Sequence, residues 1–166
     1  AEKVGWGASG RNGGQLGVAQ VDLQPDLMKL YGHDSARKLW DIADEARILV
    51  KNLINDNGID CDFRDGNLGC AVTQSDFDEF KVHADFVEKN YNYQNYGVLE
   101  ASELADTVGY GGYCGGLLDM SAGHLHPLNY VLGLARAAME AGVAIYENSR
   151  VQSIQKGDKA SAQTDK

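Results

Sequence analysis

Five of the eleven residues from Gly5 to Gln15 are glycines, and they are accompanied by a hydroxyl, a guanidinium and two carboxamides. Glycine lets the backbone adopt positive φ and approach a ligand closely, because it carries no Cβ. The successive N–H groups of such a loop form a concavity that binds anions, and Ser9 and Arg11 add donors suited to phosphate. These residues predict a loop that holds a phosphorylated ligand. The alternative is a flexible glycine-rich tail, which the spacing alone leaves open.

The residues around the loop narrow the type of phosphate site. No Gly-Lys-Ser/Thr sequence completes a P-loop, which disfavours nucleotide hydrolysis as the function. Nor is this a Gly-x-Gly-x-x-Gly turn that follows a predicted strand, which is the arrangement typical of a dinucleotide-binding fold.

Few other residues have the types and spacing that catalysis requires. His124 and His126 are weak candidates for a catalytic role, since a histidine ahead of a helix that begins with proline more often caps or packs. Asp119 and Glu147 are acids that can attract an ammonium group, but isolated acids are usually solvated. The sequence shows no Ser-His-Asp arrangement, no carboxylate pair at catalytic spacing and too few neighbouring ligands for zinc. We therefore expect no metal site, and the catalytic residues stay unidentified beyond these two histidines.

The charge and the cysteines limit the partners and the compartment. A net charge of −9 and a pI near 4.8 argue against nucleic-acid binding, because a phosphate backbone requires a basic surface. The same charge suits a cationic substrate, although many acidic proteins carry it only for solubility. No apolar run approaches the roughly 20 residues that span a bilayer. Cys61, Cys70 and Cys114 are odd in number and lack Cys-x-x-Cys spacing, which indicates reduced thiols and a cytoplasmic location.

The elements that must position these residues begin with two helices. Gln24-Pro25 is typical of a helix start, and Gly32 ends that short helix. Between Asp34 and Asn57, aliphatic residues recur every three or four positions, which predicts an amphipathic helix of about six turns. Its expected buried stripe consists of Leu39, Ile42, Ala43, Ala46, Leu49, Val50, Leu53 and Ile54.

Further along, Asp65-Gly-Asn67 predicts the turn of a hairpin between strands at 59–64 and 68–73. Ser75 is the expected cap of the next helix, and the polar tract 90–96 is expected to be a connector outside the core. A short helix at 100–106, a glycine-rich strand at 111–120 and a helix opening at His126-Pro127 follow. Strands are expected at 144–147 and 151–155. This mixture predicts an α+β fold with only remnants of a doubly wound sheet.

The stretch Gly5–Gln15 resembles the loop after the second strand of the FAD domain in D-amino-acid-oxidase-like flavoproteins. Within that family it most resembles the branch that contains gamma-glutamylputrescine oxidase. A second matching stretch begins at Gly123 with Gly-His-Leu-His-Pro-Leu-Asn-Tyr and continues to Val151. Because the two stretches keep the order and rough separation expected of the family, the resemblance covers essentially the whole chain.

The resemblance implies that the cofactor is FAD. It places Gly7, Ala8 and Ser9 against the pyrophosphate, it directs Arg11, Asn12, Gly13 and Gly14 toward the flavin ring, and it matches Val151 to a position whose backbone meets the adenine. The functional hypothesis for the segment 119–126 places it beside the flavin, at the boundary with the substrate domain. A positive group near the N1–C2=O edge of a flavin favours electron uptake. The sequence leaves open whether Arg11 reaches that edge or only a phosphate.

By the same resemblance, the chain is an internal fragment of a longer enzyme. It combines a fragment of a Rossmann-like FAD-binding domain with part of a mixed-sheet substrate domain. The expected divisions are the glycine loop at 1–20, a helical and mixed-sheet segment with part of the substrate domain at 21–142, and truncated FAD-domain strands at 143–166. Because half of the cofactor site is missing, we expect this fragment neither to retain FAD nor to be active.

The full-length enzyme implied by the resemblance oxidises the C–N bond of an amine or amino acid to an imine, with dioxygen or another acceptor reoxidising the flavin. The expected partner is therefore a small-molecule amine or amino acid, together with self-association through exposed strand edges. The alternative function is a non-catalytic binding or association module, or one half of a split flavoprotein.

Overall fold

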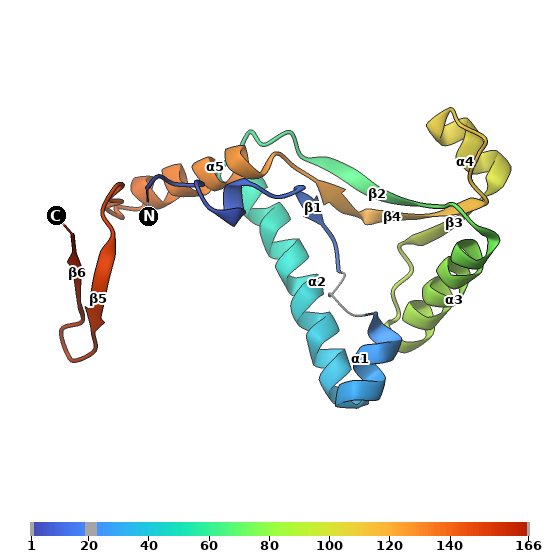
Figure 1. Cartoon of the computed structure of the whole chain (residues 1–166), viewed down its shortest axis with the longest axis horizontal. Helices are drawn as coiled ribbons and strands as arrows, with labels where there is room; N and C mark the ends of the chain where they lie inside the picture. The colour runs from blue at the N-terminus through green and yellow to red at the C-terminus, as the bar shows by residue number, and fades with distance from the viewer. Residues whose placement is uncertain (1, 19–22, 166) are drawn as a thin grey trace. The chain divides into compact units, whose positions relative to one another are not determined.

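The computed structural model describes residues 2–18 and 23–165 (Figure 1). The helical segments are η1, a 3-10 turn at Ala8–Gly10, α1 at Gln24–Tyr31, α2 at His33–Asp56, α3 at Gln74–Tyr91, α4 at Ala101–Val108 and α5 at Pro127–Glu140. The strands are β1 at Gln15–Leu16, β2 at Arg64–Ala71, β3 at Tyr96–Glu100, β4 at Gly115–His124, β5 at Val151–Gln155 and β6 at Ser161–Thr164. This mixture confirms the predicted α+β class.

The chain divides into two compact units. The sheet unit consists of Gln15–Val50 and Arg64–His124. The loop unit consists of Lys51–Phe63 and the described parts of Ala1–Gly14 and Leu125–Lys166. Each unit is described by itself.

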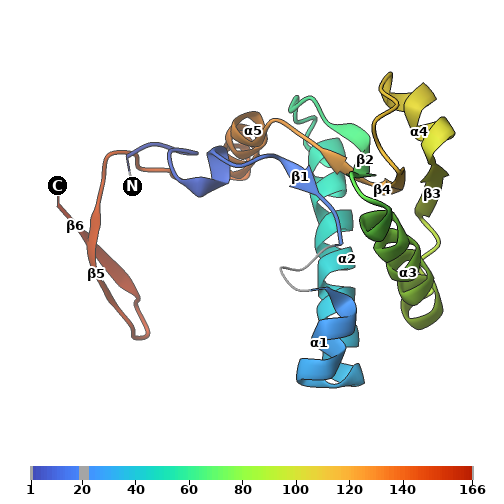
Figure 2. The same ribbon diagram turned by 45° about the vertical axis from the view of Figure 1, so that its right-hand side comes forward.

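The sheet unit is built around β4, which pairs antiparallel with three other strands. β2 follows one edge of β4, while β1 and β3 share the other edge. α3 packs on one face of this sheet (Figures 1 and 2). Gly69 of β2 permits this packing, because a Cβ there would lie 3.2 Å from the ring of Phe80 of α3. The absence of a side chain at that position thus lets the helix approach the strand.

The core of the sheet unit is largely aromatic. Trp40 of α2 stacks on Tyr91 with 4.6 Å between ring centroids, and it meets Tyr93 edge-on at 5.1 Å. The buried cluster consists of Val18, Trp40, Val87, Tyr91 and Tyr93. The prediction that the tract 90–96 lies outside the core is therefore wrong, because Tyr91 and Tyr93 are only 4% and 6% exposed. The rings alternate with exposed amide side chains, so one side of this polar tract is apolar.

The hairpin predicted at Asp65-Gly-Asn67 does not form. Instead, β2 runs through these residues, and its register against β4 shifts between Asp65 and Asn67. Gly66 has a φ of +98° at the shift, so the tripeptide is a bulge that glycine accommodates. The long pairing with β4 selects a bulge where the local residues predict a tight turn.

The boundaries of several other elements differ from the predictions. α3 is capped by Thr73 rather than Ser75, since Thr73 Oγ1 accepts from Asp76 N–H at 3.2 Å and Asp76 Oδ2 accepts from Thr73 N–H at 2.9 Å. This reciprocal pair is a capping box. β4 begins at Gly115, four residues after the predicted strand start, and residues 144–147 form no strand.

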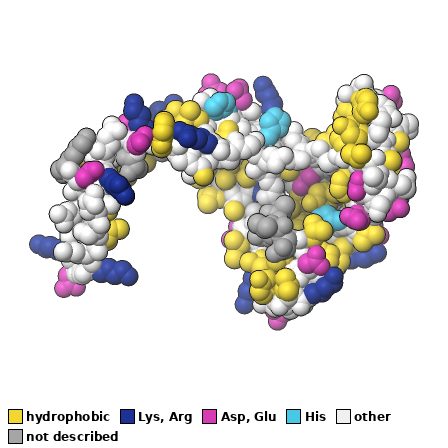
Figure 3. Space-filling view, in the orientation of Figure 1, with side chains coloured by type: hydrophobic (Ala, Val, Ile, Leu, Met, Phe, Trp, Pro, Cys, Tyr) yellow, Lys and Arg dark blue, Asp and Glu magenta, His cyan; other side chains and the backbone are white. Residues whose placement is uncertain are grey.

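α2 begins and ends close to the predicted residues, but it exposes part of the predicted stripe. Ile54 is 8% exposed, whereas Ile42 and Leu49 are 61% and 57% exposed. α1 and the first part of α2 lie side by side in both ribbon views. Figure 3 shows apolar side chains on the surface over α1 and over α4. The described residues thus leave Ile42 and Leu49 of α2 exposed, and the α2 residue that joins the aromatic core is Trp40.

In the loop unit, α5 is the helix against which the N-terminal loop packs. Gly5 lies so close to α5 that an added Cβ would be 2.6 Å from Leu128 Cδ1. Arg136 Nη2 donates at 3.2 Å to the carbonyl oxygens of both Asn57 and Gly58, which connects α5 to the end of α2. β5 and β6 form a two-stranded antiparallel hairpin.

Candidate functional site

The glycine-rich segment 5–15 forms a compact turn. Gly10 N–H donates to Gly7 O at 3.2 Å, and Arg11 N–H donates to Ala8 O at 3.0 Å, which closes the 3-10 turn η1. The segment predicted to bind phosphate therefore has a defined backbone path.

A single side chain, that of Asn12, joins the two ends of this turn. Its Nδ2 donates to Ala8 O at 3.0 Å and to Ser9 O at 3.1 Å. Its Oδ1 accepts from Gly14 N–H at 2.8 Å. The carboxamide thus uses both its donor and its acceptor groups on the loop itself. Asn12 is therefore the residue that fixes the shape of the loop.

Two glycines of the loop are required by close approaches, and two others face open space. A Cβ at Gly10 would overlap Gly5 O. Gly14 has a φ of +69°, and a Cβ there would overlap Leu125 O. By contrast, no heavy atom lies within 4 Å of the position that a Cβ would occupy on Gly7 or Gly13. That space is available to a ligand that approaches the backbone.

Many of the backbone donors of the loop are unused. Among the described residues, no acceptor bonds to the N–H groups of Gly7, Ala8, Ser9, Asn12 or Gly13. Free N–H groups at adjacent positions, with glycines that leave room above them, are the features that bind a phosphate. The donor set of this loop therefore fits the pyrophosphate of a dinucleotide cofactor.

Arg11 adds a positive charge beside these donors. Its guanidinium carbon lies 4.1 Å from the centroid of the Trp6 ring, a cation–π arrangement. Within the described part of the chain, the guanidinium N–H groups donate to no acceptor. The guanidinium is thus held at the loop by an aromatic ring while its donors stay available.

The two candidate histidines lie in different units. His124 is the last residue of β4, pairs with Gln15 and Arg64 in the sheet unit, and is exposed. His126 belongs to the loop unit and caps α5, because its Nδ1 accepts from Asn129 N–H at 3.3 Å. A nitrogen that accepts carries no proton, so this arrangement places the proton of His126 on Nε2. A catalytic role for either histidine stays a prediction.

The structure brings the segment before β5 against the segment before the glycine loop. Val4 N–H donates to Glu147 Oε1 at 2.9 Å, and Asn148 N–H donates to Glu2 O at 2.7 Å. Glu147 is thus bonded to the backbone. Val151 follows directly as the first residue of β5, and its contact with an adenine stays a prediction.

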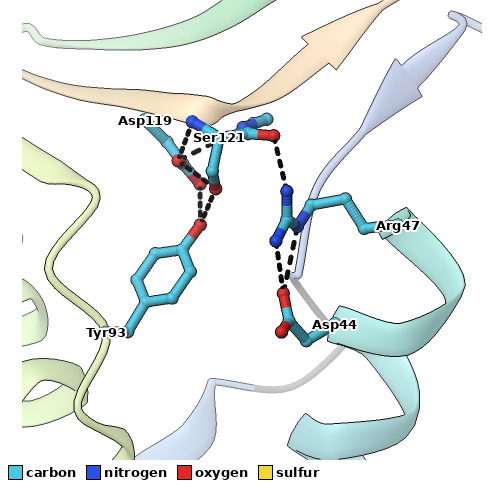
Figure 4. A network of polar contacts seen from close by, with 6 residues as sticks. Asp44, Arg47, Tyr93, Asp119 and Ser121 are labelled. Atoms are coloured by element: carbon cyan, nitrogen blue, oxygen red, sulfur yellow. Dashed lines mark hydrogen bonds and ion pairs between the residues drawn. The ribbon is translucent and has the colours of Figure 1, made fainter. Parts of the chain in front are cut away.

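A buried polar network that the sequence did not reveal centres on Asp119 of β4 (Figure 4). Asp119 is 5% exposed, so the expectation that this acid is solvated is wrong. Tyr93 Oη donates to Asp119 Oδ2 at 2.7 Å and also contacts Ser121 Oγ. Asp119 Oδ1 accepts from Ser121 N–H at 2.9 Å, from Ser121 Oγ–H at 2.8 Å and from Ala122 N–H at 3.2 Å. Alternating tyrosines in the tract 90–96 were the available sequence signal for this network.

The network extends to α2 and changes the properties of two tyrosines. Arg47 Nη1 donates to Ser121 O at 2.9 Å, and Arg47 Nη2 pairs with Asp44 at 2.6 Å. Burial raises the pKa of the Tyr93 phenol, and the neighbouring Asp119 carboxylate adds to the rise. Burial, with Asp119 as the second cause, raises the pKa of Tyr96 to about 12. Both phenols therefore stay neutral and able to donate at physiological pH.

Residues 2–18 and 23–165 contain neither a candidate metal site nor a candidate membrane span. No group of three or more His, Cys, Asp or Glu side chains gathers there in a way that could hold a metal ion. None of the helices in the described ranges is both long enough and apolar enough to cross a membrane.

Residues 1–166 match the sequence profile of the DAO family, which is described as FAD dependent oxidoreductase. The chain belongs to this family. The family membership predicted from the glycine loop and from the stretch at 123–151 is thus confirmed, and FAD is the cofactor of the family.

Relatives of the chain include OrdL of Haemophilus influenzae, a probable oxidoreductase. It is 38% identical over 149 residues, which is 90% of this chain and 35% of that protein. The gamma-glutamylputrescine oxidoreductase of Escherichia coli is 38% identical over 161 residues, which is 93% of this chain and 36% of that protein. The crystal structure of glycine oxidase from Geobacillus kaustophilus has the same fold, with a TM-score of 0.72 and 21% identity over 99% of this chain and 43% of that one. The chain thus spans about a third of the length of the curated relatives it matches.

Proposed function

We propose that the chain is part of an FAD-dependent enzyme that oxidises the C–N bond of an amine or amino acid to an imine, with dioxygen or another acceptor reoxidising the flavin. The match of the whole chain to the family of FAD-dependent oxidoreductases carries this proposal. The substrate class is supported by the names of two similar proteins, gamma-glutamylputrescine oxidoreductase and glycine oxidase.

In this proposal the loop 5–15 holds the cofactor. The free N–H groups of Gly7, Ala8 and Ser9 donate to the pyrophosphate, and Arg11, Asn12, Gly13 and Gly14 lead toward the flavin. The backbone at Val151 meets the adenine. When bound, FAD supplies the electron acceptor for the C–H bond beside the substrate nitrogen. The guanidinium of Arg11, which has free donors beside the loop, supplies positive charge to the cofactor.

The chain offers few groups for proton transfer, and direct hydride transfer needs few. His126 is engaged in capping α5 through Nδ1. His124 is exposed at the end of β4 and, unlike His126, takes no part in a helix cap. Both residues remain candidates in this proposal.

The proposal is tested with the full-length protein and a panel of amines and amino acids, by following flavin bleaching without oxygen and peroxide formation with oxygen. Hydroxy acids are the matched controls, because they present a C–O bond in place of the C–N bond. We expect bleaching and peroxide with at least one amine or amino acid and none with its hydroxy analogue. Stable oxidised flavin with every amine and amino acid would contradict the proposal and favour a non-catalytic association module.

A further inference from the structure

We propose that a cavity in the sheet unit binds the ammonium group of a small alkylamine, with Asp119 as its counter-ion. The cavity has a volume of about 220 Å³. Its lining includes Asn67, Tyr96 and Asp119 together with apolar side chains. The cavity belongs to the sheet unit, and its occupation does not require C–N oxidation.

Three polar side chains form a row across the sheet at this cavity. The register of β2 places Asn67 opposite Asp119, and the register of β3 places Tyr96 opposite Asp119 on its other edge. Directly opposed residues of neighbouring strands share one face of a sheet, so all three belong to the same face. A primary ammonium has three N–H donors, and this row offers three oxygen-bearing side chains. The row therefore offers one oxygen-bearing side chain for each N–H donor of the ammonium.

The charge of Asp119 has no counter-ion in the described part of the chain. Its carboxylate accepts hydrogen bonds from Tyr93, Ser121 and Ala122, all of which are neutral. The guanidinium of Arg47, which reaches the same network, donates to a carbonyl oxygen and pairs with Asp44 instead. Because a buried charge without an opposite charge is unfavourable, a cation that enters the cavity relieves this imbalance.

The remaining walls favour an alkylammonium over a metal ion. Val18, Phe80, Leu117 and Ala122 contribute apolar surface. The aromatic rings at the cavity also suit an organic cation through cation–π attraction, whereas a hard metal ion requires six or more oxygen ligands. At about 220 Å³ the cavity is smaller than the roughly 300–1,000 Å³ of drug-sized pockets. The ligand is therefore a compact amine.

The test is a calorimetric titration of the full-length, FAD-loaded protein with tert-butylammonium chloride, with flavin absorbance recorded in parallel. This amine has no hydrogen on the carbon that carries nitrogen, so it cannot be oxidised to an imine. We expect a binding step that leaves the flavin spectrum unchanged and that Asp119→Asn weakens by roughly ten-fold or more. Asp44→Asn is the matched control, because Asp44 is in the same network but does not line the cavity. Potassium chloride at equal concentration controls for salt.

A second variant and a direct probe keep the result independent of how Asp119→Asn folds. Leu117→Phe fills part of the cavity and retains the carboxylate, so it should weaken binding to a similar extent. In the wild-type protein, the methyl NMR signals of Leu117 should shift during the titration. The proposal would be overturned if the Leu117 signals did not move, or if potassium chloride shifted them equally. It would also be overturned if either Asp119→Asn or Leu117→Phe bound the amine as tightly as the wild type does.

Discussion

Arg11 is the residue whose removal reports most directly on cofactor binding. Its guanidinium lies over Trp6, and its donors have no acceptor among the described residues. A hydrogen bond to a charged group contributes roughly 1.5–3 kcal/mol. We therefore expect Arg11→Ala in the full-length protein to weaken FAD affinity, or to slow flavin reduction, by about ten- to a hundred-fold. Flavin fluorescence and stopped-flow reduction measure the two effects.

The matched control for Arg11 is Lys159→Ala, which removes one positive charge from the turn between β5 and β6. Lys159→Ala should leave both the FAD affinity and the rate of flavin reduction unchanged. Wild-type flavin content and reduction rate in purified Arg11→Ala would identify Arg11 as an ordinary surface arginine.

The phenols of Tyr93 and Tyr96 give a prediction for alkaline pH. Burial raises the pKa of both, that of Tyr96 to about 12, above the value of about 10 in the unfolded chain. The unfolded chain therefore loses these protons first as the pH rises. The resulting stabilisation is complete below about pH 10 and is lost between about pH 10 and 12.

We expect late phenolate absorbance and a fall in the free energy of unfolding across this window. Tyr96→Phe should remove part of the late absorbance. Simultaneous ionisation of every tyrosine in the folded protein would contradict this expectation.

At the scale of elements, the capping box of α3 is the local feature that is simplest to test. Thr73 Oγ1 accepts from the backbone of Asp76, whereas Ser75 lies within the first turn. Loss of a capping hydroxyl costs about 0.5–2 kcal/mol. Thr73→Ala should reduce the free energy of unfolding in urea by that amount, and Ser75→Ala should change it by less than about 0.5 kcal/mol. The reverse order would place the helix start at Ser75.

The unequal exposure of the aliphatic residues of α2 predicts unequal costs of truncating them. Ile54 is 8% exposed and Leu49 is 57% exposed on the same helix. In the 166-residue chain, Ile54→Ala should cost about 2–5 kcal/mol and Leu49→Ala less than about 0.5 kcal/mol. Urea unfolding measures both. Equal costs would show that another surface covers Leu49 in solution.

Elements with strong local signals could be predicted from the sequence. Proline at Pro25 and Pro127 and glycine at Gly32 mark helix boundaries that the structure reproduces closely. Asp65-Gly-Asn67 was misjudged because a hairpin turn and a bulge demand the same residue types. Only pairing with β4, some fifty residues later, decides between them.

In the candidate site, too, features set by neighbouring residues could be predicted from the sequence, whereas contacts between distant residues could not. The position of the glycine loop follows from residue types alone, and the family match confirms the chain's membership. The cap made by His126 is also local. The buried carboxylate of Asp119 was not predicted, because its partner Tyr93 is distant in sequence and joins it only when β3 pairs with β4.

At the scale of the whole molecule, cofactor retention is the decisive property. The chain spans about a third of the length of its curated relatives. Among the described residues, the phosphate donors that we propose for FAD come from one loop. We therefore expect the 166-residue chain, incubated with FAD and then gel-filtered, to show no flavin absorbance. A flavin band near one equivalent would contradict this and show that these residues suffice to hold FAD.

The carboxamide of Asn12 has a kinetic consequence for the loop. Because its three hydrogen bonds all lie within the loop, they restrict the backbone path and reduce the conformational search that precedes cofactor capture. The association rate of FAD should then depend on diffusion and on the other segments that contact it. Asn12→Ala should slow association, whereas loss of a phosphate donor should instead speed dissociation.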